Sequence, residues 1–208
     1  MIFPLSTSFT PKRRELARWD ILLLPTKPII IGLEDDFKTG VNSTLYKFKD
    51  KDGIQLNSLI PKTGTSFHLG AGLPLLNDLL RYELGLTVDA YNSSNEDPFT
   101  NYSWNTTYGG VKNSLGFFPL VDEFAFGLIA HLGFSKILSG TQLINNATYS
   151  LRTHPEFSGL MVQPGLGLAI SYNFLNDTFL SLQYDYSKSF RFRNTQEERL
   201  SFTTNRLV

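Results

Sequence analysis

Apolar and polar residues alternate strictly along three long stretches of the chain, 66–91, 111–135 and 160–187. A period of two residues places successive side chains on opposite faces of a strand. In the middle of each stretch the alternation is interrupted by a short acidic turn, at Pro74–Asp78, Pro119–Glu123 and Leu175–Asp177. The pattern therefore predicts three β-hairpins built from long strands.

The two faces of these strands differ in chemistry. In the first hairpin, Leu84, Leu86 and Val88 alternate with Gly85 and Thr87. In a soluble barrel the polar face of each strand meets water and is usually rich in Lys, Glu and Thr. Here the residues on that face are small or polar, with isolated charges. The runs also reach the roughly 9–11 residues that a membrane-spanning strand needs. This favours an all-β fold, an antiparallel transmembrane β-barrel with its apolar face toward lipid; a lipocalin-like or phage structural β-fold is the alternative.

The chain supplies enough strands to close such a barrel. Six come from the hairpins, one from the C-terminal segment 199–208, and one from either 28–37 or 41–48. About eight strands is the size at which side chains fill the interior; if both early segments pair, the barrel has ten. We expect the barrel domain to span 28–208, because residues 1–27 do not follow the alternation. They are expected to form an N-terminal extension that packs on the barrel or on a partner.

With its three alternating hairpins and short turns, segment 66–190 resembles the small outer-membrane β-barrels of Gram-negative bacteria, of the kind seen in the transmembrane domain of outer membrane protein A. The resemblance implies a bacterial outer-membrane location. It also implies a secretory signal and a terminal aromatic residue. The sequence instead starts with Met1-Ile-Phe-Pro and stops at Leu207-Val208. We expect the signal to have been removed or the sequence to be incomplete.

Composition narrows the function further. Nineteen basic and 19 acidic residues cancel, so no net charge steers the protein toward nucleic acid. The chain has no cysteine and no run of about 20 apolar residues that would make a membrane helix. Aromatic residues make up 13% and charged residues 18%, and the charged share is below the usual quarter. A lipid-facing surface would therefore come from strands.

Catalytic chemistry finds little support in the sequence. His131 and Ser135 share one strand face but are roughly 13 Å apart at the strand rise, too far for a nucleophile and its base. Lipid-A deacylases among small outer-membrane barrels carry His-x-Ser, whereas His131 is followed by Leu132-Gly133. We predict no catalytic residues, no metal site and no cofactor.

Isolated charges on the small and polar face are the more informative group. Charges inside a narrow barrel are costly unless they are paired. We therefore predict an interior network of ion pairs and hydrogen bonds, in which Glu83 pairs with Arg81, His68 or another base from across the barrel. By parity, the network consists of His68, Arg81, Glu83, Asp89, Lys112, His131, Asp185 and Arg199. A narrow ion or proton path is the alternative.

Two segments rich in Asn, Ser, Thr and Gly, 92–110 and 136–157, are predicted to be long exposed loops opposite the short turns. Loops on a rigid scaffold commonly carry recognition. Tyr102, Trp104 and Tyr108 are candidate partner contacts, because aromatic residues are enriched at binding hot spots. Alternatively, these rings form an aromatic girdle at the membrane interface.

Together these features predict a non-enzymatic integral outer-membrane β-barrel with a structural or accessory role, as a subunit of an envelope protein assembly. Its partners would be membrane lipid and other outer-membrane proteins, and not nucleic acid. Two other functions stay open: an outer-membrane lipid-processing enzyme, and a soluble small-ligand-binding β-barrel.

Overall fold

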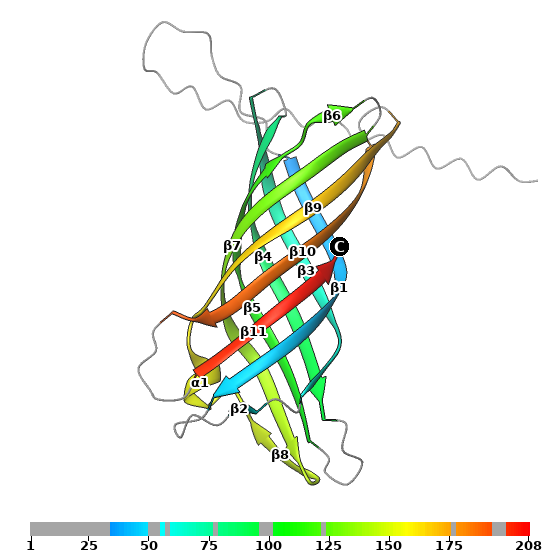
Figure 1. Cartoon of the computed structure of the whole chain (residues 1–208). Helices are drawn as coiled ribbons and strands as arrows, with labels where there is room; N and C mark the ends of the chain where they lie inside the picture. The colour runs from blue at the N-terminus through cyan, green and yellow to red at the C-terminus, as the bar shows by residue number, and fades with distance from the viewer. Residues whose placement is uncertain are drawn as a thin grey trace, which may run out of the picture. The chain divides into compact units, whose positions relative to one another are not determined.

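The computed structural model describes residues 34–49, 55–56, 59–76, 79–95, 102–121, 124–175, 178–192 and 199–208 (Figure 1). All of them belong to one compact unit, Leu33–Val208. The predicted extension 1–27 lies outside the described residues, so the predicted domain boundary stays a prediction.

Eight long strands dominate the described residues. They are β1 (Glu34–Lys49), β3 (Ile60–Leu75), β4 (Leu80–Ser94), β5 (Tyr102–Phe117), β7 (Phe124–Ile144), β9 (Met161–Leu175), β10 (Thr178–Arg191) and β11 (Arg199–Leu207). The shorter elements are β2 (Gln55–Leu56), β6 (Leu120–Val121), β8 (Ala147–Ser150) and helix α1 (Pro155–Ser158). Within the described part of the chain, no helix is long and apolar enough to cross a membrane.

The long strands pair in chain order, and every pair is antiparallel. The last strand then returns to the first, with Val41 opposite Leu207 and Lys49 opposite Arg199. This pairing closes the sheet and leaves no free edge along the shared length. The predicted eight-stranded antiparallel barrel is thereby confirmed. The two early candidate segments contribute to one strand, β1, so the alternative of ten long strands is wrong.

The three short turns lie at a common end of the barrel, as predicted. Leu80 follows the first turn and pairs with Phe117, the last residue of β5, two residues before the second turn. Phe124 follows the second turn and pairs with Tyr172, close to the third. We call this end the short-turn rim, at the top in Figure 1, and the opposite end the far rim.

The prediction of long loops at the far rim is wrong for most of their length. β4 runs to Ser94 and pairs in register with β5 as far as Ser103. β7 continues to Ile144 and returns as β8 through Asn145 and Asn146, which both have positive φ. Asparagine tolerates this left-handed conformation better than most residues. The Asn- and Thr-rich segments thus extend the hairpins because an antiparallel partner satisfies their backbone groups.

Near the short-turn rim the outer face is apolar, as the alternation predicted. Between 45% and 61% of each of these outward side chains is exposed. We call this set the apolar belt: Phe67, Leu69, Leu84, Leu86, Leu115, Leu128, Leu168, Ile170 and Leu182.

Toward the far rim the two faces exchange their chemistry. The outer face carries polar side chains, among them Ser43, Lys47, Thr63, Asn105 and Thr141. The inner face carries a buried apolar cluster, which we call the aromatic plug: Tyr46, Leu59, Tyr91, Trp104, Tyr108, Ile137, Leu151, Phe157, Met161, Leu200 and Phe202. This half has the polarity of a soluble barrel, with water outside and a hydrophobic core inside.

Glycines let neighbouring strands approach closely. A Cβ added at Gly110 would meet the backbone of β7, at the carbonyl oxygen of Phe134 and at 2.6 Å from the Cα of Ser135. We expect Gly110→Ala to lower the free energy of unfolding by about 1–3 kcal/mol, because overpacking forces the backbone to shift. Gly133→Ala is the matched control, since its nearest neighbour, Gln163 Cβ, is 3.4 Å away. Urea unfolding in detergent micelles measures both; equal losses would contradict the packing argument.

Candidate functional site in the barrel lumen

The lumen near the short-turn rim contains ionic side chains from several strands. Glu83 on β4 lies between Lys38 on β1 and His68 on β3. Lys38 Nζ donates to Glu83 Oε2 at 2.6 Å, and His68 Nε2 lies 2.5 Å from Glu83 Oε1. Glu83 is 5% exposed. This carboxylate therefore links three strands that close one side of the barrel.

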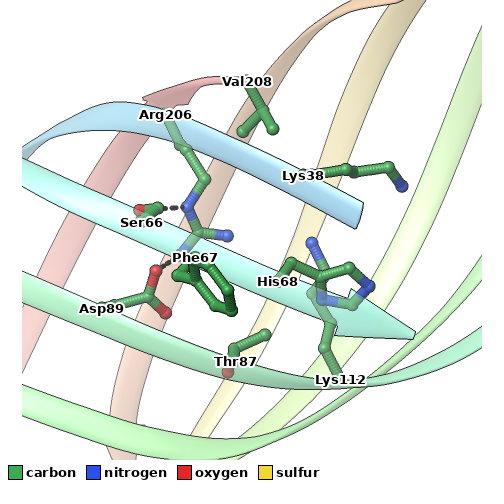
Figure 2. Close-up of a pocket in the computed structure, with 9 residues that line it drawn as sticks. All are labelled: Lys38, Ser66, Phe67, His68, Thr87, Asp89, Lys112, Arg206 and Val208. Carbon is green, nitrogen blue, oxygen red and sulfur yellow. Dashed lines mark hydrogen bonds and ion pairs between the residues drawn. The ribbon is translucent and has the colours of Figure 1, made fainter. Parts of the chain in front are cut away.

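A second cluster surrounds Arg206 on β11 (Figure 2). Its Nη2 donates to Asp89 Oδ1 at 2.7 Å, and its Nε donates to Ser66 Oγ at 2.9 Å. Asn42 Nδ2 donates to the same hydroxyl at 2.9 Å. Arg206 and Asp89 are both buried. A buried guanidinium with a carboxylate partner and further hydrogen bonds is the arrangement that offsets desolvation.

Asp185 on β10 connects the second cluster with the opposite wall. Lys112 Nζ lies 3.6 Å from Asp185 Oδ2, and Arg206 Nη1 lies 4.0 Å from the same oxygen. Gln183 Nε2 donates to Asp185 Oδ1 at 2.7 Å. The carboxylate thus stands between two cations, which stabilises its ionised form.

Glycine on the inner face makes room for the bulky polar side chains. The imidazole of His68 covers Gly85, that of His131 covers Gly165, and the carboxylate of Asp185 covers Gly167. A side chain at any of these glycines would occupy the same space. The small and polar face seen in the sequence therefore has a packing reason: each bulky polar side chain occupies the space that a neighbouring glycine leaves free.

Most predicted lumen residues lie where parity placed them. His68, Glu83, Asp89, Lys112, His131 and Asp185 are buried, and Arg81 is half-buried with its guanidinium against Gly72. His131 does not join the hydrogen-bonded clusters: its Nδ1 has no hydrogen-bond partner among the described residues.

The strand β11 differs from the prediction. The side chain of Arg199 lies outside the described residues, and the buried positions of this strand are Leu200, Phe202, Thr204 and Arg206. The prediction placed Arg199 on the inner face and so the apolar residues of β11 on the outer face. The opposite holds, because the start of β11 belongs to the half of the barrel in which the interior is apolar. Sequence reasoning therefore missed Arg206. It also missed Lys38, which lies between the two segments proposed as the first strand.

The prediction that Trp104 and Tyr108 are exposed partner contacts is wrong. They are 2% and 1% exposed and belong to the aromatic plug. Tyr46 and Trp104 rings are 5.4 Å apart, and Tyr108 and Phe202 rings are 5.5 Å apart. Tyr102 packs partly buried against the same plug, and its hydroxyl accepts from Gln142. In the half of the barrel toward the far rim, the lumen holds these aromatic rings, and their burial stabilises the barrel.

The connection from β8 to β9 completes the plug at the far rim. Phe157 of α1 is 1% exposed, and its ring lies 5.1 Å from that of Trp104. Glu156 is fully buried and accepts from Arg191 Nη1 on β10 at 2.5 Å. This segment was predicted to be an exposed loop. The sequence signal that could have identified its ordered turn is His154-Pro155, because His154 caps α1 and proline favours the first helical position.

A hydroxyl pair inside the plug allows a small, specific test. Tyr46 Oη and Thr106 Oγ1 are 2.5 Å apart and buried. We expect Tyr46→Phe to lower the free energy of unfolding by about 1 kcal/mol, the usual net value of a buried hydrogen bond. Tyr184→Phe is the control, since the 2.8 Å bond from Tyr184 Oη to Asn205 is exposed and its loss should be smaller. Urea titration measures the free energy of unfolding of both variants. An equal loss in the two would contradict a stabilising role for the buried hydrogen bond.

Two small spaces lie among the described lumen residues. One cavity of about 10 Å³ adjoins the Arg206 cluster (Figure 2), and another of about 50 Å³ lies between Glu83, Ser114 and Phe118. These volumes suit a few water molecules. Among the described residues, no group of three His, Asp or Glu side chains could hold a metal ion.

The barrel is closed, and in the half near the short-turn rim its outer face is apolar and its lumen is polar. The fold is that of a small transmembrane β-barrel. Neither a known protein family nor a curated protein matches the sequence.

Among solved structures, Neisserial surface protein A matches with a TM-score of 0.39 and 14% identity, over 84% of this chain and 97% of that protein. Ail, the attachment invasion locus protein of Yersinia pestis, matches with a TM-score of 0.37 and 12% identity, over 86% and 97%. The closed, eight-stranded antiparallel barrel of this chain is the fold that the predicted resemblance implies.

Proposed function

We propose that this protein is an integral outer-membrane β-barrel with a non-enzymatic structural or accessory role, as a subunit of an envelope protein assembly. The observation that carries the proposal is the apolar belt. Leu86 and Leu168 are each 61% exposed, and similar side chains cover the neighbouring strands. If the protein were a soluble ligand-binding barrel, water would surround the whole apolar belt. Monomeric soluble proteins rarely expose such large apolar patches to water.

The filled lumen supports a structural role. Ion pairs occupy the half near the short-turn rim, and the aromatic plug occupies the other half. Neither described cavity is large enough for a solute pathway. The lipid-processing alternative needs a polar cluster that opens sideways to lipid near His131. That side chain is 6% exposed and lies beneath the backbone at Gly165, which favours the non-enzymatic role.

The hairpin of β7 and β8 is the contact surface that we assign to an assembly partner. It extends past the end of β9, while β5 pairs along the other side of β7 as far as Ile144, and β8 pairs only with β7 in the described structure. Tyr149 is 54% exposed and Ile144 is 36% exposed. An exposed strand edge with apolar side chains can add a further strand from another chain. The extension 1–27 is the second proposed contact.

Membrane fractionation of the full-length gene product tests the membrane part of the proposal. We expect the protein to remain with outer membranes after alkaline washing and to need detergent for extraction. Recovery in the soluble fraction without detergent would overturn this part and favour the ligand-carrier alternative.

Native mass measurement after mild-detergent extraction tests the assembly part. We expect a mass above that of one chain, and loss of the larger species in Tyr149→Ser or after deletion of residues 1–27. Asn105→Ser, on the polar outer face of β5, is the matched control and should keep the assembly. A lone monomer, unchanged by all three alterations, would overturn the assembly role and leave the membrane location intact.

A further inference from the structure

A polar side chain interrupts the apolar belt. Asn113 is on the outer face of β5 and is partly exposed. It pairs with Leu84 of β4 on one side and with Leu132 of β7 on the other. The next outward residues along β5 are Val111 and Leu115. These four apolar side chains are between 40% and 49% exposed. They surround the amide on all sides, and we call them the apolar collar.

The described structure satisfies the oxygen of this amide but not its nitrogen. Tyr82 Oη donates to Asn113 Oδ1 at 2.7 Å. Among the described residues, no group accepts from Asn113 Nδ2. Asn113 is four residues from the end of β5 at Phe117, roughly 13 Å along the strand. In the proposed membrane orientation the amide therefore lies among acyl chains, which offer no acceptor, and an amide without a partner there costs free energy.

The apolar collar alone does not bring two proteins together in a bilayer. Lipid tails are as apolar as leucine, so association within the membrane depends on close packing and on hydrogen bonds between the partners. An acceptor at the depth of Asn113 therefore distinguishes a protein partner from lipid. The side chains of the collar would then pack around the polar contact and exclude other molecules from it.

A second copy of this chain provides such an acceptor at the required depth. Two copies in one membrane share an orientation, so a twofold axis along the membrane normal places their Asn113 side chains opposite each other. An amide is both donor and acceptor, and each Nδ2 can donate to the Oδ1 of the other copy. That oxygen has two lone pairs, so it can accept from Tyr82 at the same time.

The tilt of the strands favours a contact centred on one residue. The twofold axis reverses the sense of tilt in the facing strand. Two β5 strands would therefore cross at about 70–90°, twice the tilt of roughly 35–45° that strands of membrane barrels have. Contact is then limited to the crossing point and its immediate neighbours. With Asn113 at the crossing point, those neighbours are the apolar collar.

We propose that Asn113 and the apolar collar form a lateral contact between two copies of this protein in the membrane, with reciprocal hydrogen bonds between the two amides. This inference rests on the membrane location proposed above and does not depend on the hairpin of β7 and β8. Detergent covers the same apolar surface and competes with the second copy. The contact is therefore measured in lipid vesicles, whereas the native mass in detergent reports on the hairpin.

Energy transfer between labelled copies tests the contact. The chain contains no cysteine, so a single fluorophore can be attached at Asn105→Cys, on the polar outer face of β5. Donor-labelled and acceptor-labelled copies are mixed in phosphatidylcholine vesicles at low protein-to-lipid ratio. We expect energy transfer above the level of random neighbours, and a decrease when unlabelled copies are added. Transfer at the random level would overturn the proposal.

Removal of the amide shows whether Asn113 causes the association. Asn113→Leu replaces the amide by a side chain that suits lipid, so the barrel should still fold. We expect the dissociation constant of the dimer to rise about tenfold, the effect of two hydrogen bonds lost within a membrane. An unchanged constant would overturn the assigned role of the amide.

Asn205→Leu is the matched control. Asn205 is exposed on β11, on the opposite side of the barrel from β5, and it also accepts from a tyrosine, Tyr184 Oη at 2.8 Å. The control thus removes the same kind of hydrogen-bonded pair outside the proposed contact and should leave the dissociation constant unchanged. An increase equal to that in Asn113→Leu would overturn the site.

Two further measurements separate the possible failures. Labelled protein that does not float with vesicles in a density gradient contradicts the membrane location itself. Protein that floats but shows only random transfer overturns the contact and leaves the membrane location intact. A photoreactive side chain at Leu132, in the collar, identifies the occupant in native outer membranes. We expect an adduct of twice the mass of the chain; an adduct with another protein or with lipid alone would overturn the second copy as the occupant.

Discussion

Asp89→Ala should lower the free energy of unfolding by about 3–5 kcal/mol, the largest single effect that we expect. Its carboxylate accepts from Arg206 Nη2 at 2.7 Å inside the lumen. Arg206 is 5% exposed, and among the described side chains the one other carboxylate within ion-pair distance is that of Asp185, at 4.0 Å. Removal of Asp89 leaves a buried guanidinium without its close counter-ion, and desolvation then works against the folded state. Urea unfolding in micelles, followed by tryptophan fluorescence, measures the change.

The double variant Asp89→Leu with Arg206→Met is the control for this prediction. Both charges are then absent and the volume is largely retained, so we expect most of the stability to return. Asn205→Ala, on the outer face of β11, should change the free energy of unfolding little. A double variant as unstable as Asp89→Ala would show that packing, rather than an unpaired charge, dominates at this position.

Leu168→Arg should impair assembly into vesicles and lower the free energy of unfolding by about 2–4 kcal/mol, the depth-dependent cost of arginine on a lipid-facing strand position. Leu168 pairs with Leu128 and with Tyr184, both on the exposed face, so lipid surrounds it on the proposed orientation. Leu84→Arg, on the outer face of β4, should behave alike. The yield of folded barrel in vesicles and its urea midpoint measure the effect.

Asn105→Arg is the matched substitution in the polar half of the outer face. The side chain there is exposed and meets water in the proposed membrane orientation, so we expect a change within about 0.5 kcal/mol. Thr87→Ser, on the inner face, should also be tolerated. If Leu168→Arg folds as well as Asn105→Arg, the apolar belt does not face lipid.

The sequence by itself determined where most strands run and which of their faces is apolar near the short-turn rim. Period-two alternation is a local property that each strand carries without reference to its neighbours. For the same reason the positions of Glu83, Asp89 and Asp185 on the inner face followed from parity. Antiparallel hairpins with short turns also fix the common rim, because each turn returns the chain to the same end of the sheet.

Only the tertiary structure decided which environment each face meets along the whole length of the barrel. Alternation separates two faces but does not tell lipid from water or a polar lumen from a hydrophobic plug. Trp104 and Tyr108 were therefore placed outside, and Arg206 was missed, because the faces exchange chemistry toward the far rim. The closure of β11 on β1 and the docking of Phe157 against Trp104 join segments far apart in the sequence. Such contacts depend on register and on space in the lumen, which only the closed barrel defines.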